Sequence, residues 1–244
     1  MRSMKRHIQN VRRLWQTMML VACGMLVLTA CSDDDDASVK EYDSEYQIKF
    51  YSLPPYANYE QGRWYKDDSK EVFFKLSPNT QAPYFLLVCP KNEKGVQALR
   101  YLEEQRKDII LEIQKNKFHY DQDNSEDHYF VSATMYFESP DLYVSDNYYS
   151  TEIGMREGDF CRIFPSIIVN LKEGVDIKTI ENQYKDVMTL KKTNDRGDAR
   201  WSTYVFKCNV NNSYEALRLA EELHKRDDVN WAETDMYSPI YFDI

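Results

Sequence analysis

The C-terminal third of the chain carries the most restrictive pattern, because its apolar spacing alternates between the strand period and the helix period. A β-branched run at 166–171 predicts a strand. The spacing after it predicts an amphipathic helix that begins near Asp176. The apolar face of that helix consists of Ile177, Ile180, Tyr184 and Val187. Two further strands are predicted at 187–191 and 201–210, with a polar turn between them.

A second helix is predicted in this third, and a strand closes it. Asn212 is followed three residues later by Glu215, which is typical of a pair that caps a helix N-terminus. The apolar side of the helix consists of Leu217, Ala220 and Leu223, and the closing strand is predicted at 229–233. The resulting order, β-α-β-β-α-β, is that of the ferredoxin-like or split βαβ unit.

The middle third repeats part of that order. A helix is indicated by Val96, Leu99 and Leu102 and runs to about Lys107. Strands are predicted at 83–89, 109–118, 128–137 and 141–144. No second helical segment separates the last two strands. The sequence therefore predicts an α+β fold of two ferredoxin-like units in tandem, the first incomplete, at 67–158 and 159–244.

The N-terminus has the anatomy of a secretory signal peptide over residues 1–30. Five basic residues precede an apolar run at 18–28, and small residues follow. The alternative, a transmembrane anchor, is disfavoured because the run is short for a span and acidic residues follow it at once. The motif Leu28-Thr29-Ala30-Cys31 resembles the lipobox of bacterial lipoproteins. That resemblance implies that the Cys31 thiol carries lipid and attaches the chain stably to a membrane.

An acidic segment follows the lipidation motif. It resembles the export signal that sends some lipoproteins to the outer face of the outer membrane, and consists of Ser32, Asp33, Asp34, Asp35 and Asp36. The alternative is a solvated tether. Residues 31–66 are predicted to form an acidic, flexible tether to about residue 48 and then an aromatic arm or loop. The expected location is the outer membrane, with the chain facing the cell exterior.

Charge and cysteine content exclude some functions. Removal of the leader takes away five basic residues and no acidic ones, so the net charge moves from −9 to about −14. That charge argues against a nucleic-acid partner, whose affinity depends on neutralised phosphates. The mature chain keeps three cysteines besides Cys31. Cys89 and Cys208 lie in apolar runs that resemble strands, which favours small buried side chains.

The sequence indicates no catalytic machinery and no cofactor. It contains no Gly-x-Ser-x-Gly elbow, no His-Glu-x-x-His motif and no glycine-rich phosphate loop. One polar turn between His119 and His128 invites a metal interpretation, since Asp121, Asp123 and Asp127 could bind calcium. The turn lacks the glycine and the glutamate of an EF-hand. A solvated hairpin turn is favoured, so we expect neither an enzyme nor a metal site.

Tyrosine-rich stretches at 42–65 and 129–149 leave two interpretations open. Exposed aromatic rings could stack on sugars, which would make the chain a glycan-binding lipoprotein. Tyrosine is also favoured in strands, cores and interfaces. Core or interface use is the favoured interpretation.

Several segments of the C-terminal third resemble the propeptide-like domains found ahead of subtilisin-type serine proteases in secreted bacterial proteins. They are 167–176, 204–208, the Glu-Ala-Leu-Arg-Leu-Ala run at 215–220 and the Val-Asn-Trp-Ala-Glu-Thr-Asp run at 229–235. Thr234 stands where that family usually has proline. Residues 83–145 resemble a diverged preceding copy. No protease segment follows in this sequence.

The family resemblance implies a mode of action. In such domains the sheet packs on the protease and the C-terminal tail lies in the substrate cleft. Here the tail would offer Tyr241, Phe242 and Ile244 as apolar anchors. We expect a surface-anchored, non-catalytic module that binds a protein partner. The alternatives are a stand-alone inhibitor or folding helper of a subtilisin-type protease, and a glycan-binding lipoprotein.

Overall fold

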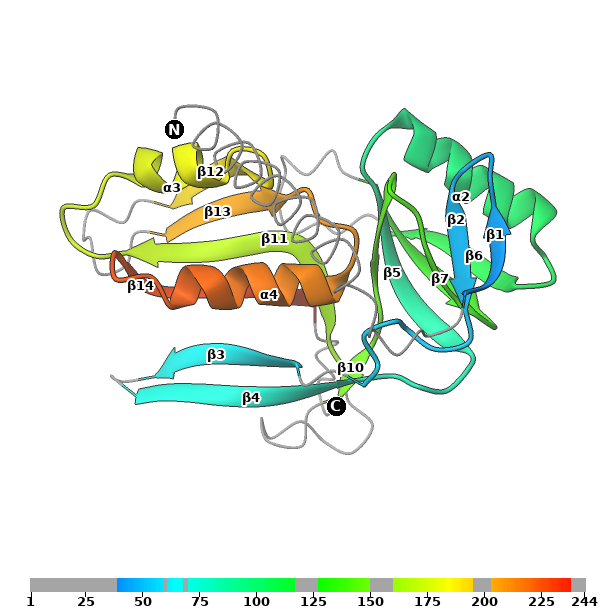
Figure 1. Ribbon diagram of the computed structural model, residues 1–244, viewed down its shortest axis with the longest axis horizontal. Helices are drawn as coiled ribbons and strands as arrows, with labels where there is room; N and C mark the ends of the chain where they lie inside the picture. The colour runs from blue at the N-terminus through cyan, green and yellow to red at the C-terminus, as the bar shows by residue number, and fades with distance from the viewer. Residues whose placement is uncertain are drawn as a thin grey trace, which may run out of the picture. The chain divides into compact units, whose positions relative to one another are not determined.

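The computed structural model confirms the α+β class (Figure 1), with three helices among the described residues and strands in most of the rest. All described residues belong to one compact unit that spans 37–244. They are 39–58, 61–67, 70–116, 127–149, 160–194 and 203–237. We call 39–149 the N-terminal half and 160–237 the C-terminal half. None of the helices described is long and apolar enough to cross a membrane.

The C-terminal half contains a four-stranded antiparallel sheet with the strand order β12-β13-β11-β14. Its elements are β11 (Arg162–Leu171), α3 (Ile177–Tyr184), β12 (Met188–Asn194), β13 (Thr203–Cys208), α4 (Ser213–His224) and β14 (Val229–Tyr237). α4 packs on β11 and β14, and α3 packs on β12. The predicted apolar side of α4 is buried, with Leu217, Ala220 and Leu223 each at most 5% exposed.

The N-terminal half contains a second four-stranded antiparallel sheet, with the order β6-β7-β5-β9. Its elements are β5 (Tyr84–Pro90), α2 (Glu93–Gln105), β6 (Ile110–Asn116), β7 (His128–Ala133) and β9 (Leu142–Ser145). Asn92 caps α2 by accepting a hydrogen bond from the Gly95 N–H at 3.0 Å. A Cβ at Gly95 would lie 2.3 Å from the Asp141 carbonyl oxygen, so this contact requires glycine. In both halves the strands lie in the order second, third, first, last.

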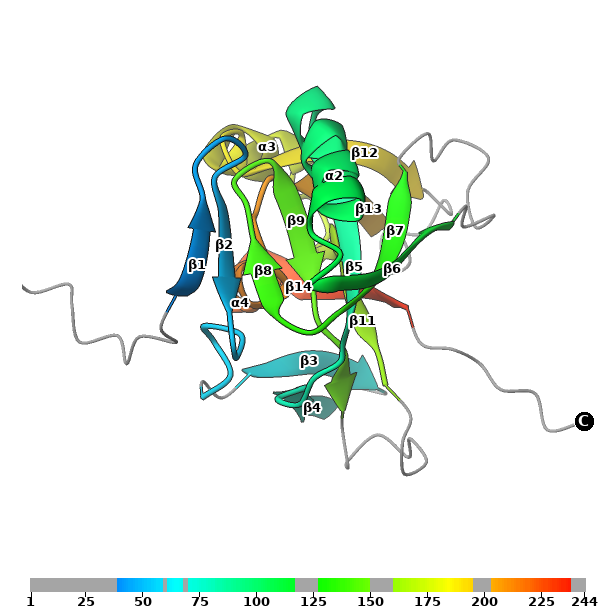
Figure 2. The same cartoon turned by 90° about the vertical axis from the view of Figure 1, so that its right-hand side faces the viewer.

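Part of the predicted tether and part of one predicted strand form a three-stranded sheet, β1-β2-β8 (Figure 2). Its strands are β1 (Val39–Asp43), β2 (Ile48–Tyr51) and β8 (Tyr136–Glu138). The tether prediction is wrong for residues 39–48, because Ile48 and Phe50 alternate with Lys49 and are both fully buried. The single strand predicted at 128–137 is also wrong. The N–H and hydroxyl of Thr134 both bond to the Ile109 carbonyl, after which the chain joins β2.

Another small sheet, β10-β4-β3, lies next to the C-terminal half in Figure 1. Its strands are β3 (Gln61–Asp67), β4 (Lys70–Pro78) and β10 (Tyr148–Tyr149). β3 contacts both α4 and β14. Residues 50–66, predicted as an aromatic arm or loop, therefore contribute to β2 and β3.

Helix α3 is shorter than its sequence pattern indicates. It begins after Asp176, whose side chain accepts a bond from the Lys178 N–H, and it ends at Tyr184. Val187, which the helical spacing placed on the apolar face, lies beyond the helix in a turn where its N–H bonds to the Tyr184 carbonyl. Its side chain is 38% exposed. The helical spacing of apolar residues thus continues past the end of the helix into the turn before β12.

Candidate functional site

The site residues expected from the sequence lie outside the described residues. These are the lipidation residue, the export segment and the tail: Cys31, Ser32, Asp33, Asp34, Asp35, Asp36, Tyr241, Phe242 and Ile244. Lipidation, export and the inhibitory tail therefore stay predictions.

The polar turn considered for a metal is described only at its end. Asp127 forms an ion pair with Lys115 at 2.5 Å. His128 is buried, with its ring edge-on to Phe164 at 5.3 Å between centroids. Among the described residues, no three His, Cys, Asp or Glu side chains gather as metal ligands would. Asp127 and His128 thus serve the hairpin and the core.

A buried polar cluster joins the two halves at the N-terminus of α4. The Tyr148 hydroxyl and the Ser213 hydroxyl lie 2.7 Å apart, and the Tyr56 hydroxyl lies 3.3 Å from the same Ser213 oxygen. Tyr56 also donates to the Tyr136 hydroxyl at 3.1 Å. All three tyrosines are nearly fully buried, and burial raises their pKa values well above the usual value. These rings pack inside the protein, where they cannot stack on a glycan.

The cap of α4 extends this cluster. Asn212 accepts the Glu215 N–H at 2.9 Å and donates its side-chain amide to the Glu138 carboxylate at 2.8 Å. Glu215 accepts the N–H of Asn211 at 2.7 Å, one residue before the position that a capping box uses. Burial raises the pKa of Glu138, which lies on β8 of the N-terminal half. One half therefore fixes the start of the helix that belongs to the other.

Backbone contacts reinforce the junction. The Val144 N–H donates to the Asn211 carbonyl at 2.9 Å, and the Tyr143 hydroxyl donates to the Ile163 carbonyl at 2.7 Å. Burial raises the pKa of the Cys208 thiol to about 12, so this thiol is protonated at neutral pH. Cys89, like Cys208, is buried as predicted.

Asp146 is a fully buried acid at the same junction. Its Oδ1 accepts the Asn147 N–H at 2.7 Å, and its Oδ2 has no hydrogen-bond partner within the described residues. Burial raises its pKa well above the usual range, opposed in part by that N–H and by the charge of Arg162. A buried carboxyl without a bonded cation is more stable as the neutral acid.

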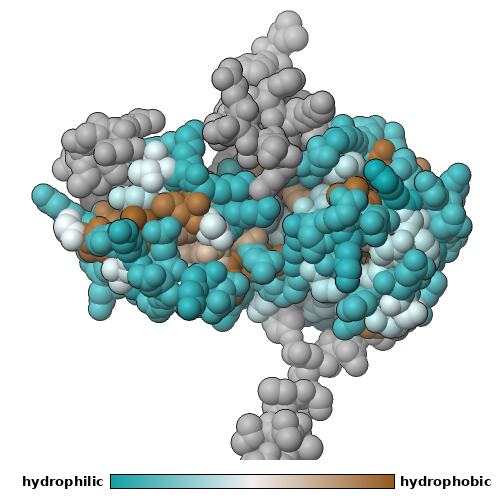
Figure 3. Space-filling model, turned by 90° about the horizontal axis from the view of Figure 1, so that it is seen from above, coloured by the Kyte–Doolittle hydropathy of each residue, from teal (hydrophilic) through white to brown (hydrophobic). Residues whose placement is uncertain are grey.

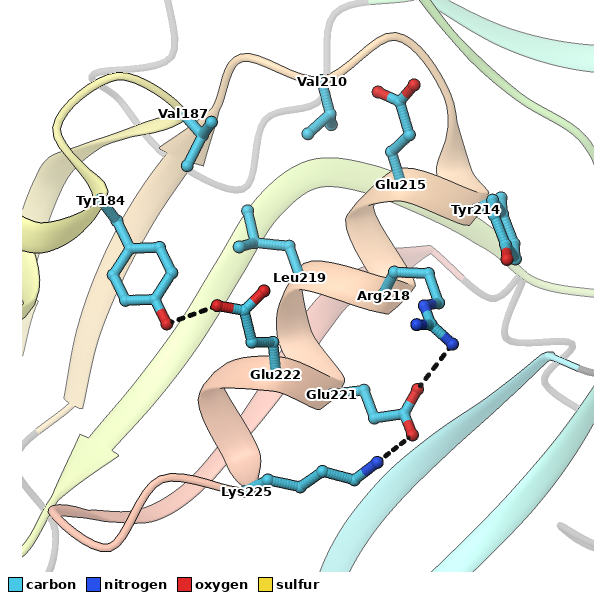
Figure 4. A pocket seen from close by; sticks show the side chains of 10 residues that line it. All are labelled: Tyr184, Val187, Val210, Tyr214, Glu215, Arg218, Leu219, Glu221, Glu222 and Lys225. Atoms are coloured by element: carbon cyan, nitrogen blue, oxygen red, sulfur yellow. Dashed lines mark hydrogen bonds and ion pairs between the residues drawn. The ribbon is translucent and has the colours of Figure 1, made fainter. Parts of the chain in front are cut away.

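An open groove lies between α3 and α4 of the C-terminal half, with a volume of about 740 Å³ (Figure 4). Its apolar floor is formed by side chains of α3, the turn after it, the loop before α4, and α4, namely Tyr184, Val187, Val210 and Leu219. Tyr214, Glu215, Arg218, Glu221, Glu222 and Lys225 complete the lining. Seen from above, hydrophobic side chains gather over this half of the molecule (Figure 3).

The charged groups of the groove differ in how they are partnered. Glu221 pairs with Lys225 at 2.6 Å and lies 3.9 Å from Arg218, so both lining cations face one carboxylate. Glu222 accepts the Tyr184 hydroxyl at 2.8 Å. Within the described part of the chain, no Lys or Arg forms an ion pair with Glu222. Burial, and then the bond to Glu222, raises the pKa of Tyr184.

This arrangement suits binding. An apolar floor with a few oriented polar groups is the general composition of a ligand or peptide site. The groove residues were missed at the sequence level because they come from a turn, a loop and a helix. One signal was present: Leu219 lies off the buried stripe of Leu217, Ala220 and Leu223 on α4.

Comparison with known proteins found no family model, no curated protein and no solved structure that matches this chain.

Proposed function

We propose that this chain is a lipoprotein of the outer membrane, anchored through Cys31, that acts as a non-catalytic protein-interaction module. We infer that its body consists of two ferredoxin-like units in tandem, the first without its second helix. The shared strand order of the two four-stranded sheets supports this inference. Fold alone does not specify a function, so the proposal depends on a site.

The observation that carries the proposal is the groove between α3 and α4. Val187 is 38% exposed in this groove, beside Leu219 and Val210, on a half whose helix α4 is fixed by buried bonds from the other half. Exposed apolar surface rimmed by polar residues marks interaction sites. A preformed site also loses less conformational entropy on binding.

The direct test is capture of a partner through this groove. The chain from Ser32 onward, which keeps the whole compact unit, is incubated with envelope proteins of the source cells and cross-linked from position 218, which also lines the groove. We expect a defined protein to be captured by the parent and lost with Val187→Glu. Leu111→Glu is the matched control, because Leu111 is 56% exposed on β6 of the other half. Equal capture by both variants would contradict the proposal.

A second candidate, an inhibitor or folding helper of a subtilisin-type protease, is favoured by the other face of the C-terminal sheet. α3 and α4 pack on one face. On the opposite face, Ile168 lies beside Val205 and Glu233, and all three are partly exposed. The family that the sequence resembles uses this face against the protease. The tail after β14 would then enter the cleft as an added strand.

The two candidates separate in one assay. The chain from Ser32 onward and a version that ends at Met236 are titrated against a panel of subtilisin-type proteases. Inhibition that vanishes on truncation, with the circular dichroism spectrum unchanged, supports the inhibitor. The absence of inhibition by either chain favours the interaction module.

Membrane attachment has its own test. Cys31→Ala is expected to release the chain from membranes or to block its processing, because the acyl chains attach to that thiol. If the variant still fractionates with the outer membrane like the parent, the anchor lies elsewhere.

A further inference from the structure

We propose that the groove between α3 and α4 binds a partner segment in which an aliphatic side chain is adjacent to a basic one. This inference rests on the proposed function and names the chemistry of the partner. It concerns the helix side of the C-terminal half, and not the sheet face or the tail.

The basic residue is inferred from the carboxylates of the groove. Both lining cations, Arg218 and Lys225, already face Glu221. Glu222 accepts a hydrogen bond from a neutral group, the hydroxyl of Tyr184. A cation on a bound segment can therefore approach Glu222 without displacing an existing ion pair.

The other cations near the groove are bonded to groups other than Glu222. The Arg226 guanidinium lies over the Tyr184 ring, 5.7 Å from its centroid. It is held by Asp228 through two bonds of 2.8 Å each. Glu215, the third lining carboxylate, accepts hydrogen bonds from Asn211. Lys91, whose charge interacts with that of Glu215, donates to the Asn211 side chain at 2.6 Å.

The aliphatic residue is inferred from the floor. Figure 4 shows the Glu222 carboxylate beside Leu219, with Val187 on the far side of the groove. Because the carboxylate lies beside the floor, a basic side chain adjacent to an aliphatic anchor there would face Glu222. The acidic charge of the mature chain, about −14, also attracts a basic segment before contact.

Three dipeptide probes test the chemistry on the isotope-labelled chain from Ser32 onward. They are N-acetyl-Leu-Arg-amide, N-acetyl-Leu-Gln-amide and N-acetyl-Leu-Glu-amide, each titrated by nuclear magnetic resonance at low ionic strength. We expect shifts at the signals of Val187, Val210 and Leu219. The Arg peptide should bind several-fold more tightly than the Gln peptide, and the Glu peptide least. The difference should shrink as salt screens the charge.

A charge-removing variant isolates the contact. Glu222→Gln keeps an acceptor for the Tyr184 hydroxyl, so the groove should stay formed while the preference for Arg over Gln disappears. Glu104→Gln, on the exposed side of α2, is the matched control and should keep the preference. Equal affinities in the parent overturn the proposal. A preference that survives in Glu222→Gln overturns it too, as does the absence of groove shifts with all three peptides.

Failure here is distinguishable from failure of the proposed function. If cross-linking from position 218 captures a partner but the peptides show no charge preference, only the inferred chemistry is wrong. If the peptides show the preference but no envelope protein is captured, the chemistry of the groove holds and the interaction module does not.

Discussion

The N-terminal and C-terminal four-stranded sheets have the same strand order but are covered by different elements. In the C-terminal half α4 packs on β11 and β14, the first and last strands. In the N-terminal half no described helix separates β7 from β9. β8 lies there instead and pairs with the β1–β2 hairpin. Between its third and last strands, the C-terminal sheet thus has a helix, and the N-terminal sheet has a strand of another antiparallel sheet.

The β1–β2 hairpin, which precedes the N-terminal four-stranded sheet, packs against the helix of that sheet. β1 and β2 are tied to α2, since the Tyr101 hydroxyl donates to Asp43 at 2.8 Å and Arg106 pairs with Glu41 at 2.9 Å. The Arg106 guanidinium also lies 4.5 Å from the centroid of the Phe50 ring. The C-terminal sheet is covered by helices that lie between its own strands, whereas the N-terminal sheet also uses β1 and β2, which precede its first strand, β5.

The largest effect is expected from a substitution in the β1–β2 hairpin. Phe50→Ala should lower the free energy of unfolding by about 3–5 kcal/mol, because it removes a fully buried ring from the core. The measurement is urea denaturation followed by circular dichroism. Val39→Ala, at a site 43% exposed on β1, is the control and should stay within about 0.5 kcal/mol of the parent. Equal effects of the two would show that the hairpin does not belong to the core.

The corresponding test in the C-terminal half uses its helical cover. Leu217→Ala should lower the free energy of unfolding by about 2–5 kcal/mol, since Leu217 lies on the buried side of α4 and is 4% exposed. Val187→Ala, in the groove on the outer side, should change stability by no more than about 0.5 kcal/mol. A large loss from Val187→Ala would mean that the groove is part of the core and is closed to a partner.

The buried acid at the junction predicts a pH dependence. The pKa of Asp146 is raised in the folded state above an unfolded value of about 3.9, so the folded state retains the proton longer. Stability from this group is fully present below the unfolded pKa and falls as pH rises through the folded pKa. The slope for one proton is about 1.4 kcal/mol per pH unit at most.

Asp146→Asn separates this group from the rest of the chain. The variant should lose that slope in a series of denaturation curves from acidic to mildly alkaline pH, and it should gain stability over the parent as pH rises. Asp108 and Asp228 act in the opposite sense, because arginine partners lower their pKa values. They are present in both proteins and cancel in the difference. A difference that does not vary with pH would show that Asp146 is ionised in the folded protein.

The smallest effect compares the two helix caps. Asn92→Ala should cost about 1 kcal/mol, the usual loss for an N-cap. Asn212→Ala should cost about 2 kcal/mol, at the upper end of that range, because Asn212 also donates to the buried Glu138. Thermal melts of both variants give the comparison. Equal losses would indicate that the Glu138 contact adds nothing to the junction.

Local signals predicted much of the fold. The strands and helices of the C-terminal half, the Asn212 cap and the buried side of α4 follow from apolar period and capping chemistry, which act over a few residues. β8 could not be found this way. The alternation of apolar residues continues from Val131 to Phe137, while the change of sheet depends on the distant partner β2.

The sequence did not predict the β1–β2 hairpin or the groove, for related reasons. The acidic composition around β1 resembles a solvated tether, and only the alternation of Ile48 with Phe50 indicated a buried face. The groove unites Val187, Val210 and Leu219 across elements whose packing is not written in any one segment. Among the described residues, Glu222 has no paired cation because Arg218 and Lys225 both face Glu221, and this pairing is set only in the folded protein.

The central structural claim is that the two halves form one folded unit that begins at the β1–β2 hairpin. Two truncated chains test it directly by thermal unfolding, one starting at residue 38 and one starting at residue 53. The first is expected to unfold in a single cooperative transition like the parent. The second is expected to lose that transition, because it lacks Ile48 and Phe50 and leaves β8 and α2 uncovered. Native-like cooperative unfolding of the chain that starts at residue 53 would contradict the claim.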